Sequence, residues 1–195
     1  MEEKYPTRPP VGRICYYNQM NETLSPESEP TEEEIKQAAA TLRRLPPGRL
    51  PLDVFIEVVR LVPAPIVEVV PVRKNSNGET EILLTKREET DPIWPGMLHT
   101  PGTVILASDK GENNEEAFMR IQKELGGVET SEPHFVKNTF HEVKRGKEQA
   151  QVYWAEVTGA PVVGEFYSAA QLPDTLVDTQ VDFIKAAVSN FEASV

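Results

Sequence analysis

Two patterns of apolar and polar residues divide the chain. Residues 31–63 carry apolar side chains at helical spacing, and shorter apolar runs typical of strands begin near residue 64. The segment TEEEIKQAAATLRRL starts with Thr31 and Glu34, the Thr-x-x-Glu capping box of a helix. LPLDVFIEVVRLV (50–62) predicts a second helix with Pro51 in its first turn, although its Val and Ile content leaves a strand as the rival reading. The two segments together predict a helical hairpin ahead of the main domain.

The main domain alternates strands and helices. PIVEVVPVRK and TEILLTKRE read as strands, and the Asn-Gly between them predicts a hairpin. The following segments predict, in order, a Pro/Gly-rich loop (89–102), a short strand (103–108), a loop and helix (109–127) and a β-hairpin (134–159). A last strand and bend (163–173) and a C-terminal helix (174–191) complete the domain. This order predicts a mixed α/β (α+β) domain. We therefore expect a flexible N-terminal arm (1–30), a helical extension (31–63) and one main domain (64–195).

Charge and composition restrict the classes of partner. The chain of 195 residues has a formal net charge of -11, which disfavours duplex nucleic acid and anionic membranes as partners. The negative net charge does not exclude a small anionic ligand, because a few cationic side chains close to the ligand act on it more strongly than distant acidic residues do. The single cysteine, Cys15, excludes an internal disulfide framework and favours the cytoplasm. No secretory signal or membrane-spanning run is recognisable.

The segment DKGENNEEAFMRIQKELGG carries the candidate chemistry. Its helix places Ala117, Phe118, Ile121 and Leu125 on one side. Glu112, Glu116, Arg120 and Glu124 follow at four-residue steps along the other flank. Carboxylates at this spacing are close enough to converge on one hard cation such as Mg²⁺. The rival interpretation is a solvated acidic flank with Glu–Arg pairs.

The same segment resembles the signature of the Nudix hydrolase family, G-x5-E-x7-R-E-U-x-E-E-x-G-U, where U is a bulky apolar residue. Glu112 and Arg120 reproduce E-x7-R, and Glu124 falls on the first of the paired glutamates. The flanking segments IVEVVPVRK…ILLTKRE, WPGMLHTPGT and GEFYSAAQLPD are similar to the family's opening strands, Trp loop and ending. The resemblance covers roughly residues 65–191. It implies a Nudix-like mixed sheet sandwiched by helices.

The signature is degenerate. In this register, the two other family glutamates fall on Ile121 and Leu125, which are apolar. A shift by one residue instead places Arg120, Lys123 and Glu124 on the carboxylate positions. Gly102 lies too early in either register, and PGT replaces PGG.

The resemblance implies roles for particular residues. A hydrolase of this type would use Mg²⁺ or Mn²⁺ held by Glu112, Glu116 and Glu124, with Arg120 orienting the carboxylates. Glu112, Glu124 and Arg120 are thus the catalytic candidates. The substrate-binding candidates are Trp94, His99, Arg87 and Gly102. For Trp94 we keep two alternatives, stacking on a nucleobase and plugging its loop, and for His99 a substrate contact or a backbone cap.

Three functions follow as hypotheses. The first is a metal-dependent hydrolase of a nucleoside diphosphate derivative, with reduced or lost activity. The second is an inactive module of the same fold that binds a nucleotide or phosphorylated metabolite. The third is a protein-interaction scaffold in which the hairpin 31–62 is a docking surface, with a homodimer among the expected assemblies.

Overall fold

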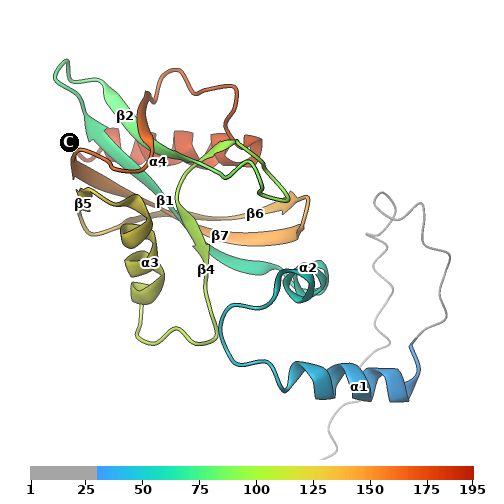
Figure 1. The fold of residues 1–195 in the computed structure, drawn as a ribbon. Helices are drawn as coiled ribbons and strands as arrows, with labels where there is room; N and C mark the ends of the chain where they lie inside the picture. The colour runs from blue at the N-terminus through green and yellow to red at the C-terminus, as the bar shows by residue number, and fades with distance from the viewer. Residues whose placement is uncertain (1–29) are drawn as a thin grey trace, which may run out of the picture. The chain divides into compact units, whose positions relative to one another are not determined.

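The first compact unit contributes one described helix. The computed structural model describes residues 30–195, and contacts divide the chain into Met1–Leu45 and Pro46–Val195 (Figure 1). The predicted arm, apart from Pro30, lies outside the described residues. Helix α1 (Glu32–Leu42) has the predicted capping box, in which Glu34 N–H donates to Thr31 Oγ1 at 3.3 Å and Thr31 N–H donates to the Glu34 carboxylate at 2.7 Å. No residue of α1 is buried.

The second unit, Pro46–Val195, contains the remaining elements. Its helices are α2 (Leu52–Leu61), α3 (Glu115–Leu125), a 3₁₀ turn η1 (Asp178–Gln180) and α4 (Val181–Glu192). Its strands are β1 (Ala64–Lys74), β2 (Thr80–Lys86), β3 (Leu98–His99), β4 (Gly102–Val104), β5 (Val128–Thr130), β6 (His134–Val143), β7 (Gly146–Gly159) and β8 (Glu165–Ser168). None of the helices within residues 30–195 is long and apolar enough to cross a bilayer.

Strand β1 is the centre of a mixed sheet. It runs parallel to β7 from Ala64–Glu148 to Val72–Glu156. On its other side, its first half pairs with β4 and its second half pairs with β2, both antiparallel. The sheet order is β3-β2-β1-β7-β5, with β6 beside β7 and β8 beside β2. The sheet is therefore mixed, as the family resemblance implied, with one parallel pair between antiparallel pairs.

Helices cover both faces of this sheet. Successive side chains of a strand point to opposite faces, so Ile66, Val70 and Val72 of β1 pack in the cluster that contains α4. Val67 and Val69 pack in the cluster that contains α3. Figure 1 shows these two helices beside the sheet. The predicted mixed α+β fold, a sheet between helices, is confirmed.

Helix α2 belongs to the same body. Its Val59 is 2% exposed and packs in the α4-side cluster. Opposite it, Gly146 at the start of β7 has φ +132°, and a Cβ there would lie 2.8 Å from the carbonyl oxygen of Val59. The helix interpretation of residues 50–62 is thus confirmed over the strand alternative. The pairing of α1 with α2 as a hairpin stays a prediction.

Three local features differ from the sequence predictions. The helix expected over 174–191 begins at Val181, after the 3₁₀ turn η1. The strand expected over 103–108 ends at Val104, because the chain turns at Leu106–Asp109, where the Leu106 N–H donates to the Asp109 carboxylate at 2.9 Å. The short strands β3 and β5 were not expected from the sequence; each is held by pairing with a longer strand, β2 or β7.

Candidate functional site

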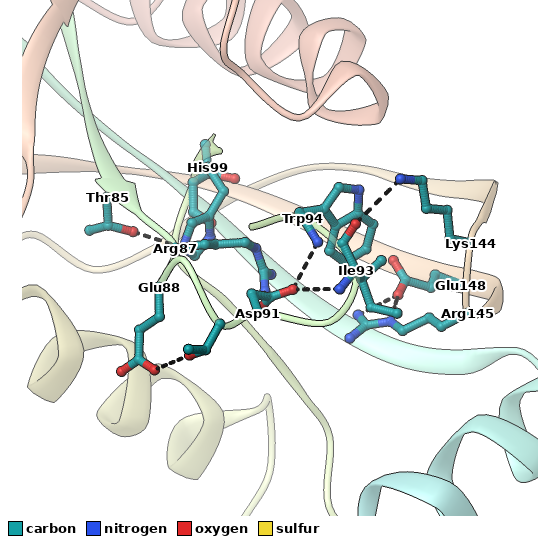
Figure 2. Close-up of polar contacts among 12 residues, drawn as sticks. Thr85, Arg87, Glu88, Asp91, Ile93, Trp94, His99, Lys144, Arg145 and Glu148 are labelled. Carbon is teal, nitrogen blue, oxygen red and sulfur yellow. Dashed lines mark hydrogen bonds and ion pairs between the residues drawn. The ribbon is translucent and has the colours of Figure 1, made fainter. Parts of the chain in front are cut away.

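The loop that joins β2 to β3 folds around the carboxylate of Asp91 (Figure 2). Asp91 accepts hydrogen bonds from the backbone N–H groups of Ile93 at 2.9 Å and Trp94 at 2.8 Å, and from the Arg87 guanidinium at 2.6 Å. Burial alone would raise the pKa of Asp91, but these donors outweigh it and hold the pKa below its usual value. The loop is thus fixed by an ionised side chain.

Trp94 is enclosed within this arrangement. Its side chain is 8% exposed and packs with Val143 and Val177. The guanidinium carbon of Arg87 lies 4.9 Å from the centroid of the Trp94 ring, and that of Arg145 lies 5.3 Å away. Cation–π contact with both arginines stabilises this packing. Of the two alternatives for Trp94, this geometry favours the loop plug, since the ring is not open to a base.

His99 makes internal hydrogen bonds through both ring nitrogens. Its Nδ1 lies 2.7 Å from the Thr100 carbonyl oxygen, and its Nε2 lies 3.0 Å from Thr85 Oγ1. Burial, with a smaller contribution from the positive charge of Arg87, lowers the pKa of His99 to about 4. A carbonyl only accepts, so Nδ1 carries the proton and Nε2 accepts from Thr85. The neutral imidazole therefore joins β3 to β2.

Two buried carboxyl groups line a small polar cavity beside Trp94. Glu68 comes from β1 and Glu148 from β7, and the other polar lining residues are Arg87, His141, Arg145, Thr179 and Gln180. The cavity measures about 20 Å³, enough for an ordered water but far below the hundreds of cubic ångströms of a typical ligand site.

The two carboxyl groups of this cavity differ in charge. Glu148 accepts from Arg145 Nε at 2.6 Å and from His141 Nε2 at 3.1 Å. Burial would raise the pKa of Glu148, but these partners outweigh it and lower the pKa. For Glu68, burial raises the pKa to about 8, assisted by the charge of Glu148 and opposed by a 3.0 Å hydrogen bond from Thr100 Oγ1. At neutral pH, Glu68 is therefore protonated and Glu148 is ionised.

Gly102 makes room for Glu68. The two residues are cross-strand partners between β4 and β1. A Cβ at Gly102 would lie 2.5 Å from the carboxyl carbon of Glu68. The substrate-binding role expected for Gly102 stays a prediction, and the structure shows this glycine accommodating a buried acid of its own chain.

The carboxylates expected to bind metal do not fit a metal site. Glu112 lies exposed in the turn before α3, Glu116 is half-buried in its first turn, and Glu124 is exposed near its end. Within residues 30–195, no three His, Cys, Asp or Glu side chains are placed to hold a metal ion. A Mg²⁺ or Mn²⁺ ion needs several oxygen ligands at one point. The residues present therefore do not match the Mg²⁺ or Mn²⁺ ligand set that the resemblance implied.

The apolar face of α3 occupies the core instead. Ile121 is 3% exposed and Leu125 is fully buried, and both pack with Ala117 against β1 residues Val67 and Val69. These are the residues on which one register of the family signature places glutamates. Introducing two carboxylates here would bury charge without partners, at a cost of several kcal/mol each.

Arg120 has a partner that the sequence did not indicate. Its guanidinium donates to both carboxylate oxygens of Asp109, at 2.5 and 2.9 Å, and to the Val104 carbonyl at 3.0 Å. The expected partners Glu112 and Glu124 take no part, although the charge of Glu116 helps to raise the Arg120 pKa after the larger contribution of Asp109. Arg120 thus clamps the loop before α3 to the helix.

The positive charges of two arginines act on the pKa of Glu124. Although its side chain is exposed, neighbouring protein desolvates the carboxylate enough to raise its pKa, and the charges of Arg87 and Arg49 oppose this effect. The charge of Arg87, in the loop after β2, thus acts on the Glu124 carboxylate of α3.

Sequence reasoning missed Glu68, Asp91, Asp109 and Glu148. Glu68 had a signal, because it is the only charged residue within the apolar run PIVEVVPV. Such an acid inside a central strand indicates a buried polar network. Asp91, Asp109 and Glu148 stand in polar segments, where nothing distinguishes a buried carboxylate from a solvated one.

Solved structures resemble this chain in fold. No protein-family model matches the sequence, and no curated protein matches it either. A mutT/nudix family protein from Listeria innocua is 16% identical, with a TM-score of 0.50, over 68% of this chain and 97% of that one. NrtR of Shewanella oneidensis is 16% identical, with a TM-score of 0.51, over 67% of this chain and 64% of that one.

A third structure has the same degree of similarity. The C-terminal domain of mouse MUTYH, in complex with human PCNA, is 14% identical, with a TM-score of 0.51, over 67% of this chain and 90% of that one. Identities this low show fold alone, and the fold is the one that the sequence resemblance implied. The main body of this protein has the Nudix fold.

Proposed function

We propose that this protein is a Nudix-fold module without the metal-dependent hydrolase centre, and that it acts by binding another protein. The observation that carries the proposal is the burial of Ile121 and Leu125 in the core. Apolar side chains cannot ligate a divalent cation. The side chains of Glu112, Glu116 and Glu124 are spread along the loop and helix rather than gathered at one point.

The candidate substrate contacts support binding of a protein over binding of a nucleotide. Trp94 is enclosed, His99 uses both ring nitrogens internally, Arg87 is paired with Asp91, and Gly102 faces Glu68. A nucleotide site needs a pocket of several hundred cubic ångströms. The cavity beside these residues, about 20 Å³, is much smaller.

An aromatic surface supports the choice of a protein partner. It consists of Phe118, Phe135, Phe140 and Tyr153, on the α3 side of β6 and β7. Phe135 is 53% exposed and Phe140 is 67% exposed. The ring of Tyr153 lies 5.5 Å from that of Phe135 and 4.9 Å from that of Phe118, both edge-to-face. Phe140 lies further along β6, opposite Gln149 of β7. Exposed aromatic side chains on one face of a sheet are typical of protein-binding surfaces.

The test is a comparison of turnover. Phosphate or nucleoside monophosphate release is measured from a panel of nucleoside diphosphate derivatives with Mg²⁺ and then Mn²⁺, for wild type, Glu112→Gln and Glu124→Gln. We expect no metal-dependent turnover above that of the two variants. Turnover that needs metal and falls about a hundredfold or more in either variant would overturn the proposal and restore the hydrolase hypothesis.

Thermal melting of the same proteins tests the second hypothesis, an inactive module that binds a nucleotide. We expect no change in melting temperature when nucleotides are added, because the enclosed residues offer them no contacts. A nucleotide-dependent rise in melting temperature without turnover would favour an inactive nucleotide-binding module. The cytoplasmic location expected from the sequence belongs to the same proposal.

A further inference from the structure

Among the described residues of its own unit, 30–45, helix α1 has no other helix or strand to pack against. It has 11 residues and is the only described helix of the unit Met1–Leu45. An isolated helix of this length is marginal in water even when its sequence favours helix. Its Ile35 is 56% exposed and its Leu42 is 48% exposed. The helix therefore presents an apolar stripe that something else should cover.

The stripe is narrow and contains small residues at its centre. Ile35, Ala38, Ala39 and Leu42 recur at three- and four-residue steps, so they lie along one side of the helix. Alanine at the middle of the stripe lets a second helix approach closely. Such a stripe fits a helix of similar shape rather than a flat surface.

The charges of α1 select its partner. The first turn contains Glu32, Glu33 and Glu34, and the helix is followed directly by Arg43 and Arg44. An antiparallel copy of the same segment would place its arginines beside these glutamates, and the reverse at the other end. A parallel copy would instead bring like charges together. The segment is thus self-complementary in the antiparallel direction only.

We propose that α1 is a homodimerisation helix that pairs antiparallel with α1 of a second copy of this chain. A twofold axis near Ala38 and Ala39 sets Ile35 of each copy against Leu42 of the other. This arrangement is closed, so it yields dimers rather than chains of molecules. Two short helices bury less than a standard interface, so the dimer forms at high protein concentration and weakens with salt.

The first test measures molecular mass by sedimentation equilibrium of the full chain over a wide concentration range. We expect wild type to dimerise, Leu42→Glu to raise the dissociation constant about tenfold or more, and Ala40→Glu, on the opposite side of α1, to change it little. Because α1 buries no residue, the melting temperature of the main body should stay the same in both variants. A monomer at every concentration, or a dimer unaffected by Leu42→Glu, would overturn the proposal.

The second test concerns direction and partner. Two double variants are compared. One carries Arg43→Glu with Arg44→Glu, and the other carries Glu32→Lys with Glu33→Lys. Each variant alone should fail to self-associate. Mixed together, they should form a heterodimer, because each then presents the charge that the other lacks. Self-association of either one alone at wild-type strength, or no association of the mixture, would refute the antiparallel charge pairing. Neither result depends on whether the protein has enzymatic activity.

Discussion

Substitution of Glu68 by Gln should make the protein more stable at neutral pH. Glu68 is buried in β1 and its pKa is raised to about 8, mainly by desolvation. In the unfolded chain the same group titrates near 4.5. Between these two values, folding requires the carboxyl to take up a proton. Glutamine has nearly the shape of the protonated acid and needs no proton.

The magnitude follows from the pKa difference. One proton taken up on folding costs about 1.4 kcal/mol of stability for each pH unit above the unfolded pKa. The stability that Glu68 contributes is fully present below pH 4.5 and falls until the pH passes the folded pKa near 8. Between pH 5 and pH 7 the loss is about 3 kcal/mol. At neutral pH, the Glu68→Gln variant should thus melt about 6–12 °C above wild type.

The assay is urea unfolding followed by circular dichroism, at pH 5, 6, 7 and 8, for wild type and Glu68→Gln. The difference in unfolding free energy between the two proteins should be small at pH 5 and grow steadily to pH 8. Glu156→Gln removes an exposed carboxyl of β7 and serves as the control, for which the difference should stay constant. A Glu68→Gln difference that is constant within about 0.5 kcal/mol across this range would refute the reasoning, because it would mean that Glu68 is ionised in the folded protein.

Three further predictions concern packing. Ile121→Glu buries a charge in the core and should lower the unfolding free energy, measured by urea unfolding, by about 3–5 kcal/mol. The control Met119→Glu, on the exposed side of α3, should change it by less than about 0.5 kcal/mol. Equal effects of the two substitutions would contradict the core position of Ile121. Gly102→Ala should lower the unfolding free energy by about 1–3 kcal/mol, because the added methyl group would contact Glu68. In a double-mutant cycle, Glu68→Ala should restore part of the unfolding free energy that Gly102→Ala removes. Additive effects of the two substitutions would argue against the contact. Trp94→Ala should lower the unfolding free energy, measured by thermal melting, by about 3–5 kcal/mol. A decrease below about 1 kcal/mol would show that the packing of the ring does not stabilise the loop.

Local chemistry explains why much of the fold could be predicted. The capping box at Thr31 and Glu34 and the Asn-Gly turn act through residues close in sequence, and both appear as expected. In the turn, the Asn75 side chain accepts from the N–H groups of Asn77 and Glu79. Such signals require no knowledge of the rest of the molecule.

The candidate site could be predicted only in part, because its contacts are distant in sequence. Arg120 pairs with Asp109, Glu68 meets Thr100, and Trp94 packs between Arg87 and Arg145. Periodicity identified the apolar side of α3, including Ile121 and Leu125. It could not show that these side chains occupy the space between helix and sheet, or that the expected substrate contacts are engaged by other residues of the chain.

The central parallel pair also has a consequence for how the protein folds during synthesis. Ala64 of β1 pairs with Glu148 of β7, which the ribosome adds 84 residues later (148 minus 64). Until then, the apolar β1 has only its local hairpin with β2 and the nearby β4. At typical rates of about 5–20 residues per second, this exposed interval lasts several seconds or more. Such non-local pairing predicts slow folding and a nascent chain that needs protection from aggregation before β7 emerges.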